Sequence, residues 1–170
     1  MSGTRIRLAC VADADAVARG EHDTAAEPGF LVARPGEIPA SAFARKIEEL
    51  TTLGRYIVCE VDGRIAGHAF LDPMRLAGIA HVFRLNLVVY PGYRRRGLGG
   101  AMLASLLEWA HADGRVGKVE LNVRASNAAA IRLYLRHGFE QEGRLRRRVK
   151  LPDGSLVDDL VMGLGIGVVP

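Results

Sequence analysis

Residues 81–123 constrain the fold more than any other stretch, because a strand pattern, a helix pattern and a second strand pattern follow one another there. His81 to Tyr90 is apolar and rich in β-branched residues, Leu98 to His111 has helical spacing, and Lys118 to Val123 is again strand-like. A strand, a crossover helix and a strand favour a parallel pair with a right-handed connection. The chain is therefore predicted to contain one parallel strand pair.

Hairpin signals flank this unit on both sides. Asp62-Gly63 lies between two strand-like runs in residues 55–71, and Asp153-Gly154 lies between two others in residues 139–164. Asp-Gly pairs supply the positive φ angles of tight hairpin turns, so the strands around them should be antiparallel. With a further strand at residues 4–11, the pattern predicts a mixed α/β fold. Its sheet should have about seven strands, mostly antiparallel, with helices on both faces.

The remaining segments are predicted to be helices and one long loop. Asp13 is expected to cap a helix that begins with AVARG, and residues 41–50 have helical spacing. Ser126-Asn127 is expected to cap a helix that ends at Gly138. Residues 21–39 contain three prolines and two glycines, so we predict an irregular loop there.

The composition is that of an ordinary globular protein. The chain has 170 residues, of which 49% are hydrophobic and 25% charged, so one domain spanning residues 1–170 is expected. The first residues lack the apolar core of a signal peptide, and no apolar run is long enough to span a membrane, which predicts a cytoplasmic location. Cys10 and Cys59 each lie in an apolar run, so both are predicted to be buried, reduced and without a chemical role. No metal site is predicted.

Arginines are concentrated in two clusters, Arg94 to Arg96 and Arg144 to Arg148, although the net charge is only +4. Such clusters suit a polyanionic partner, either a phosphate-bearing cofactor or a nucleic acid, and they are also typical of a solvated face.

The first cluster belongs to a glycine-rich motif, Arg94-x-x-Gly97-x-Gly99, that separates a strand from a helix. Relaxed matches beginning at Arg64 and Arg75 lie in a strand or lead into one. Phosphate binding needs glycines at the start of a helix, where unpaired N–H groups and the positive end of the dipole face the ligand. Only residues 94–100 meet this condition, and they are therefore the candidate anion site.

Two other nucleotide-binding motifs also contain glycines between a strand and a helix. A dinucleotide fingerprint draws support from Glu120, at about the right distance for a ribose-binding acid, but Met102 stands where a small residue is needed. A nucleoside triphosphate loop is excluded because no Gly-Lys-Ser/Thr follows.

The residues LNLVVYPGYRRRGLGGAML and ELNVRASNAAAIRLYLRHGFEQEGRLRR together resemble the GNAT superfamily of N-acetyltransferases. The resemblance covers roughly residues 55–164, and the end of the chain looks most like branches that acetylate free amino acids or protein N-termini. It implies a GNAT-like sheet in which the parallel pair is splayed, with acetyl-CoA as the cosubstrate.

The resemblance also implies which residues contact the cofactor. The backbone N–H groups of residues 95–100 would hold the coenzyme A pyrophosphate, beside the charge of Arg94. Residues 87–89 would lie at a bulge in the splayed strand and pair through their backbone with the pantetheine arm and the thioester oxygen. The cofactor-binding candidates are therefore Leu87, Val88, Val89, Arg94, Arg95, Arg96, Gly97, Leu98, Gly99, Gly100 and Asn127.

Tyr134 matches the tyrosine that protonates the departing thiolate in this superfamily, and a phenol near its ordinary pKa stays protonated at neutral pH. It would also fit an apolar helix face, and Asn127 would also fit a helix cap. The acceptor amine must lose a proton before it attacks. His81 is the first candidate for this base, by resemblance to the amino-acid branch. The alternatives are acids of the early loop: Glu21, Asp23, Glu27 and Glu37.

The leading hypothesis is direct transfer of an acetyl group from acetyl-CoA to a primary amine, without a covalent enzyme intermediate. The amine would belong to an amino acid or similar small molecule, or to a protein N-terminus. The alternatives are a basic nucleic-acid-binding module and a coenzyme A-binding regulator without activity. The expected partners are acetyl-CoA and an amine substrate, with a second copy of the chain as a further candidate. Nucleic acid is disfavoured, and no membrane partner is expected.

Overall fold

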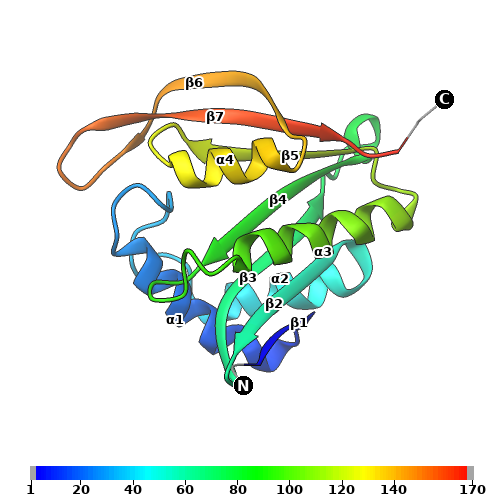
Figure 1. Ribbon diagram of the computed structural model, residues 1–170, viewed down its shortest axis with the longest axis horizontal. Coiled ribbons are helices and arrows are strands. Elements are labelled where there is room, and N and C mark those ends of the chain that lie inside the picture. The colour runs from blue at the N-terminus through cyan, green and yellow to red at the C-terminus, as the bar shows by residue number, and fades with distance from the viewer. Residues whose placement is uncertain (1–2, 168–170) are drawn as a thin grey trace.

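A computed structural model describes residues 3–167, which form one seven-stranded sheet with helices on both faces (Figure 1). The elements in chain order are β1 (Thr4–Leu8), η1 (Val11–Asp13), α1 (Ala14–Ala25), α2 (Ala40–Leu53), β2 (Arg55–Val61), β3 (Arg64–Pro73), η2 (Ala77–Ile79), β4 (Val82–Val89), α3 (Leu98–Asp113), β5 (Lys118–Arg124), α4 (Ala128–Arg136), β6 (Glu140–Lys150) and β7 (Leu156–Gly165). The predicted mixed fold is confirmed.

The sheet has the order β1-β2-β3-β4-β5-β7-β6, and only the β4–β5 pair is parallel. Asp62 and Gly63 have φ angles of 51° and 76°, so the β2–β3 hairpin turns through the two left-handed residues that the Asp-Gly pair predicted. Helix α3 makes the crossover between β4 and β5, as the strand, helix and strand pattern required.

Two apolar cores lie on opposite faces of the sheet. Figure 1 shows α3 and α4 in front of the sheet and α1 and α2 behind it. The larger core joins α3 and α4 to the central strands through side chains such as Met102 and Phe139. The smaller core joins α1 and α2 to β2 through side chains such as Val17, Ile47 and Val58.

Three expectations for the first third of the chain were wrong. Strand β1 ends at Leu8, and helix α1 continues to Ala25, so Glu21 lies in a helix and not in the predicted loop. Cys10 is exposed, whereas Cys59 is buried as predicted.

No helix within the described residues is long and apolar enough to cross a membrane.

Candidate active site

Strands β4 and β5 separate partway along their length. They pair only from Val82↔Lys118 to Arg84↔Glu120. Beyond this point β4 stays paired with β3, and β5 stays paired with β7 as far as Arg124. The predicted splay is therefore present, and it opens a wedge between two strands that are both firmly held on their outer sides.

The register of β4 determines which backbone groups face this wedge. The N–H of Tyr90 donates to the carbonyl of Ala66 on the β3 side, at 2.9 Å. Because alternate residues of an antiparallel strand direct both polar groups to the same neighbour, Val88 also faces β3. The groups of Leu87 and Val89 face the wedge. Of the three predicted residues, two can therefore offer their backbone to a ligand, and Val88 cannot.

The bulge predicted at residues 87–89 does not occur in the described ladder. Pairing with β3 is continuous from Pro73↔Phe83 to Gly67↔Val89. The wedge arises because β5 turns away from β4, without an extra residue in β4.

The glycine-rich loop leads from β4 into α3 through two left-handed residues. Arg95 has φ 61°, and Gly97, the residue that precedes the helix, has φ 77°. Alternating right- and left-handed residues turn successive N–H groups toward one concave site, which suits an anion. Within residues 3–167, the N–H groups of residues 94–100 have no hydrogen-bond acceptor, and the first turn of α3 carries no acidic residue. The loop has the donors and the dipole that a diphosphate needs.

Glycine at position 99 keeps the passage between the loop and the wedge open. A Cβ atom placed on Gly99 would lie 3.4 Å from Leu133 of α4 and 3.6 Å from both Leu87 and Val89 of β4. A larger side chain would therefore fill the space where α3, α4 and the splayed strand meet.

Arg94 is held by the protein itself. Its Nε donates to the carbonyl of Val89 at 3.2 Å, its Nη1 lies 2.5 Å from Oε2 of Glu27, and its guanidinium stacks on Phe30 at 3.9 Å from the ring centre. The side chain therefore fastens the segment between α1 and α2 to the cofactor loop. Only its buried Nη2, which has no partner within the described residues, remains for a ligand.

Tyr134 lies on the buried side of α4, where Asn127 caps the helix. The Oδ1 of Asn127 accepts a hydrogen bond from the N–H of Ala130 at 3.2 Å, which confirms the cap. The Tyr134 ring packs edge-on against Phe139 with centroids 5.7 Å apart. Burial raises the pKa of Tyr134 to about 12, opposed by the positive charge of Arg124, so the phenol is protonated at neutral pH. Its hydroxyl makes no hydrogen bond within the part of the chain that the structure describes.

His81 is not brought together with these residues. It precedes β4 at the end where β4 and β5 are paired, eight residues from Val89, or roughly 26 Å along an extended strand. Its ring packs against Gly117, and its carbonyl accepts hydrogen bonds from Gly117 and Lys118. This position argues against His81 as the base, because the wedge opens at the other end of the strand.

The acids expected in the early loop occupy four different environments. Glu27 pairs with Arg94, Glu37 accepts a hydrogen bond from the N–H of Arg34, and Asp23 is exposed. Glu21 is buried and contacts His68, a histidine on β3 that is fully enclosed. The sequence interpretation missed His68, although a single histidine within the apolar run RIAGHAFL was the available signal.

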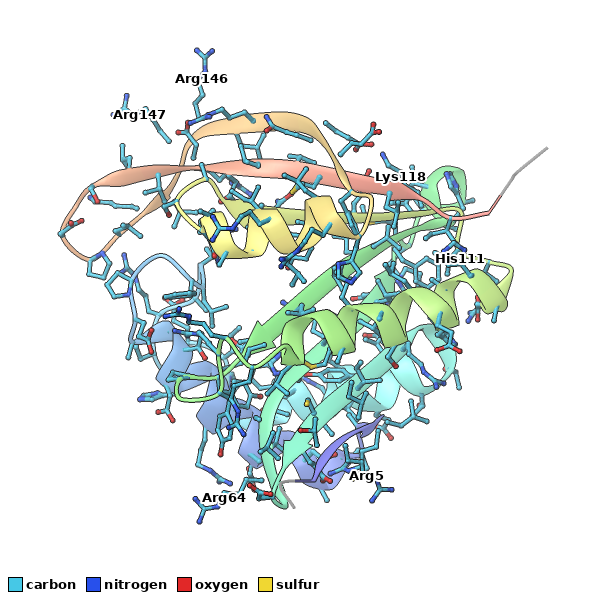
Figure 2. All side chains as sticks on the ribbon, viewed as in Figure 1. Arg5, Arg64, His111, Lys118, Arg146 and Arg147 are labelled. Carbon is cyan, nitrogen blue, oxygen red and sulfur yellow. The ribbon has the colours of Figure 1, made fainter. Side chains whose placement is uncertain are left out.

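The second arginine cluster lies apart from the wedge, on the edge strand β6. Figure 2 shows Arg146 and Arg147 projecting away from the sheet, while Arg144 pairs with Asp158 at 2.6 Å.

Comparison with known proteins places this geometry among acetyltransferases. The model of the Acetyltransferase (GNAT) family matches residues 24–139. The chain is 31% identical over 108 residues to the L-amino acid N-acetyltransferase AaaT of Escherichia coli. The aligned residues are 64% of this chain and 66% of that protein. The chain is 41% identical over 83 residues to the [Ribosomal protein bS18]-alanine N-acetyltransferase of the same organism, covering 49% of this chain and 55% of the relative. The chain thus spans only about half to two thirds of the length of these relatives.

A solved structure has the same fold. The structure of yncA from Salmonella typhimurium with its cofactor acetyl-CoA superposes with a TM-score of 0.89, over 99% of this chain and 97% of that one, at 22% sequence identity.

Proposed function

The chain belongs to the acetyltransferase (GNAT) family, and we propose that it transfers an acetyl group directly from acetyl-CoA to a primary amine of a small molecule or a protein N-terminus. The observation that carries this proposal is that the loop of residues 94–100 adjoins, at Gly99, the side chains of β4 beside the wedge between β4 and β5. Within residues 3–167, the loop amides and the N–H groups of Leu87 and Val89 have no hydrogen-bond acceptor, whereas the carbonyl of Val89 accepts from Arg94.

Each part of this site fits one part of acetyl-CoA. The N–H groups of residues 95–100 would hold the pyrophosphate, with Arg95 and Arg96 adding charge. The backbone of Leu87 and Val89 would bind the pantetheine arm as an added strand does. An N–H of these residues at the thioester oxygen would stabilise the negative charge that develops there when the amine attacks.

Tyr134 is proposed as the acid in this reaction. As the new C–N bond forms and the C–S bond breaks, the thiolate leaves and takes the phenolic proton. The raised pKa of Tyr134 keeps that proton in place at neutral pH. Because the hydroxyl has no hydrogen-bond partner among residues 3–167, it is able to donate to sulfur.

The acceptor is an amine in both named relatives, one acting on L-amino acids and the other on a ribosomal-protein alanine. We therefore propose the same range of acceptors for this chain. The cytoplasmic location, the single domain and the homodimer stay predictions from the sequence.

In the test, the purified protein is mixed with acetyl-CoA and one amine at a time, and the release of coenzyme A is followed with a thiol reagent. The amines are amino acids, N-terminal peptides, polyamines and aminoglycosides. At least one amine should support turnover. Tyr134→Phe should lower kcat about 100-fold or more, the usual contribution of a general acid. Tyr134→Phe should unfold at the same temperature as the wild type, which would show that the loss of activity comes from the missing hydroxyl and not from misfolding. Full activity of Tyr134→Phe would refute the assigned acid.

A further inference from the structure

Glu21 occupies an unusual position on helix α1. The side of α1 that packs on the sheet carries Ala14, Val17 and Thr24, and Glu21 lies on the same stripe at helical spacing. The residue is only 8% exposed. A carboxylate is rarely buried on an apolar face unless something there compensates for the lost hydration, so its surroundings indicate its role.

The group that meets Glu21 is His68, at the centre of the sheet. Its Nε2 lies 3.1 Å from Oε1 of Glu21, but the two atoms are not aligned as a hydrogen bond, so Nε2 keeps an unused hydrogen-bonding position. Its Nδ1 lies 2.7 Å from the hydroxyl of Tyr90, which can in turn donate to the carbonyl of Val17 at 3.5 Å. With Nδ1 as the donor to Tyr90, Nε2 carries no proton and is able to accept one.

Glu21 is also one of the residues that line a cavity of about 410 Å³ between α1 and the segment that leads into α2. His68 is the cross-strand neighbour of Val88, and Tyr90 directly follows β4. The pair therefore connects a cavity large enough for a small amine to the strand at which the acetyl group is proposed to lie.

We propose that Glu21 and His68 together form the proton acceptor for the amine: Glu21 binds the ammonium group of a small substrate in the cavity and His68 shares the released proton. This inference rests on the proposed function and replaces His81 as the base. Tyr90 and Val17 are positioning groups, because they fix the orientation of the imidazole through the Tyr90 hydroxyl.

The proton balance of this step is complete. The ammonium group gives one proton to the Glu21–His68 pair, directly or through a water molecule, and becomes a neutral amine. The amine nitrogen forms a bond to the acetyl carbon as the bond to sulfur breaks, and its second proton leaves as the amide forms. Tyr134 supplies a proton to the thiolate and must then be reprotonated. Of the two protons that leave the nitrogen, one therefore replaces the proton of Tyr134, and the other is released to solvent as the Glu21–His68 pair returns to its initial state.

Several other charged or titratable groups lie near the Glu21–His68 pair, and their charges influence how proton uptake by the pair depends on pH. Burial, with the charge of Glu21 adding to it, raises the pKa of Tyr56 and Tyr90 above the usual range, so both hydroxyls stay neutral. Asp13 on η1 is a third such group. The others line the cavity: Asp15, Arg19, His22 and Asp23 from α1, and Arg34 from the segment before α2.

The experiment measures kcat/KM for an amine that the wild-type protein acetylates, in wild type and Glu21→Gln, from pH 6 to pH 10. The variant should be about 100-fold slower at pH 7, the usual contribution of a general base. The deficit should narrow above pH 9, because the free amine then deprotonates in water without help. KM for acetyl-CoA should not change. Glu48→Gln, the same substitution at an exposed position of α2, is the control.

Tyr90→Phe provides a second variant that keeps the ring in place against Gly20 and removes only the hydroxyl. It should lower kcat/KM about 5-fold, the equivalent of one hydrogen bond, and shift the pH profile. If Glu21→Gln does not fold, Tyr90→Phe tests the inference in its place: an unchanged pH profile of kcat/KM would then contradict it.

The outcomes separate the two proposals. If no amine supports turnover by the wild type, the proposed function fails. If the wild type is active and Glu21→Gln either matches it or shows the same deficit at every pH, the function stands and this inference is wrong.

Discussion

A buried ion pair beside the candidate acid should dominate the stability of the β5–β7 half of the sheet. Arg124 and Asp159 are direct cross-strand partners, with side chains only 8% and 3% exposed. The guanidinium makes two hydrogen bonds to the carboxylate, from Nε to Oδ1 and from Nη2 to Oδ2. Asp159→Asn leaves a buried guanidinium uncompensated, which costs about 3–5 kcal/mol of unfolding free energy.

The neighbouring residue offers a matched control. Asp158 pairs with Arg144 on the exposed side of the same strand, where solvent screens the interaction. Asp158→Asn should therefore lower the free energy of unfolding far less than Asp159→Asn does. Urea unfolding at pH 7 measures both variants, and the slope of free energy against denaturant should be the same in each.

The double variant Arg124→Met/Asp159→Leu completes this comparison. Apolar side chains of similar volume should recover most of the stability that Asp159→Asn loses, because no charge is then left without a partner. Equal losses in Asp158→Asn and Asp159→Asn would refute the reasoning that burial makes the second pair different.

Three further outcomes are expected. Gly99→Val should raise KM for acetyl-CoA about 5- to 150-fold, since overfilling a packed space costs about 1–3 kcal/mol, while kcat at saturation changes less; steady-state kinetics measure both. Glu27→Gln should loosen the segment of residues 26–39, seen as faster amide hydrogen exchange there with α3 unaffected. The pKa of Asp13 is lowered, chiefly by hydrogen bonds from Arg7. That stabilisation is complete above the unfolded pKa near 3.9 and is lost as pH falls through the lower folded value. Tm measured between pH 2 and pH 6 should therefore fall less steeply in Asp13→Asn.

The architecture was predictable because it depends on local signals. The Asp62-Gly63 pair encodes its own turn, and the glycines between β4 and α3 mark the start of a helix. The end of α1 differs from the prediction because the prolines and glycines begin only at Pro28, so residues 21–25 are free to continue the helix.

The candidate site was only partly predictable because it also depends on register and on distant contacts. The loop donors follow from sequence alone, but the direction of Val88 follows from the β3–β4 register, which no single segment encodes. The contact between Glu21 and His68 joins residues 47 positions apart in the chain. His81 shows the converse: its position in the sequence suggested a role in the site, whereas the structure places it before the end of β4 that is paired with β5.

An NMR titration of the ¹⁵N-labelled protein with acetyl-CoA tests the central claim most directly. Saturable shifts of the amide signals of residues 95–100, of Leu87 and of Val89, with little change at Val88, are the expected result. Saturable binding that leaves the signals of residues 95–100 unmoved, or no binding at millimolar acetyl-CoA, would contradict the account.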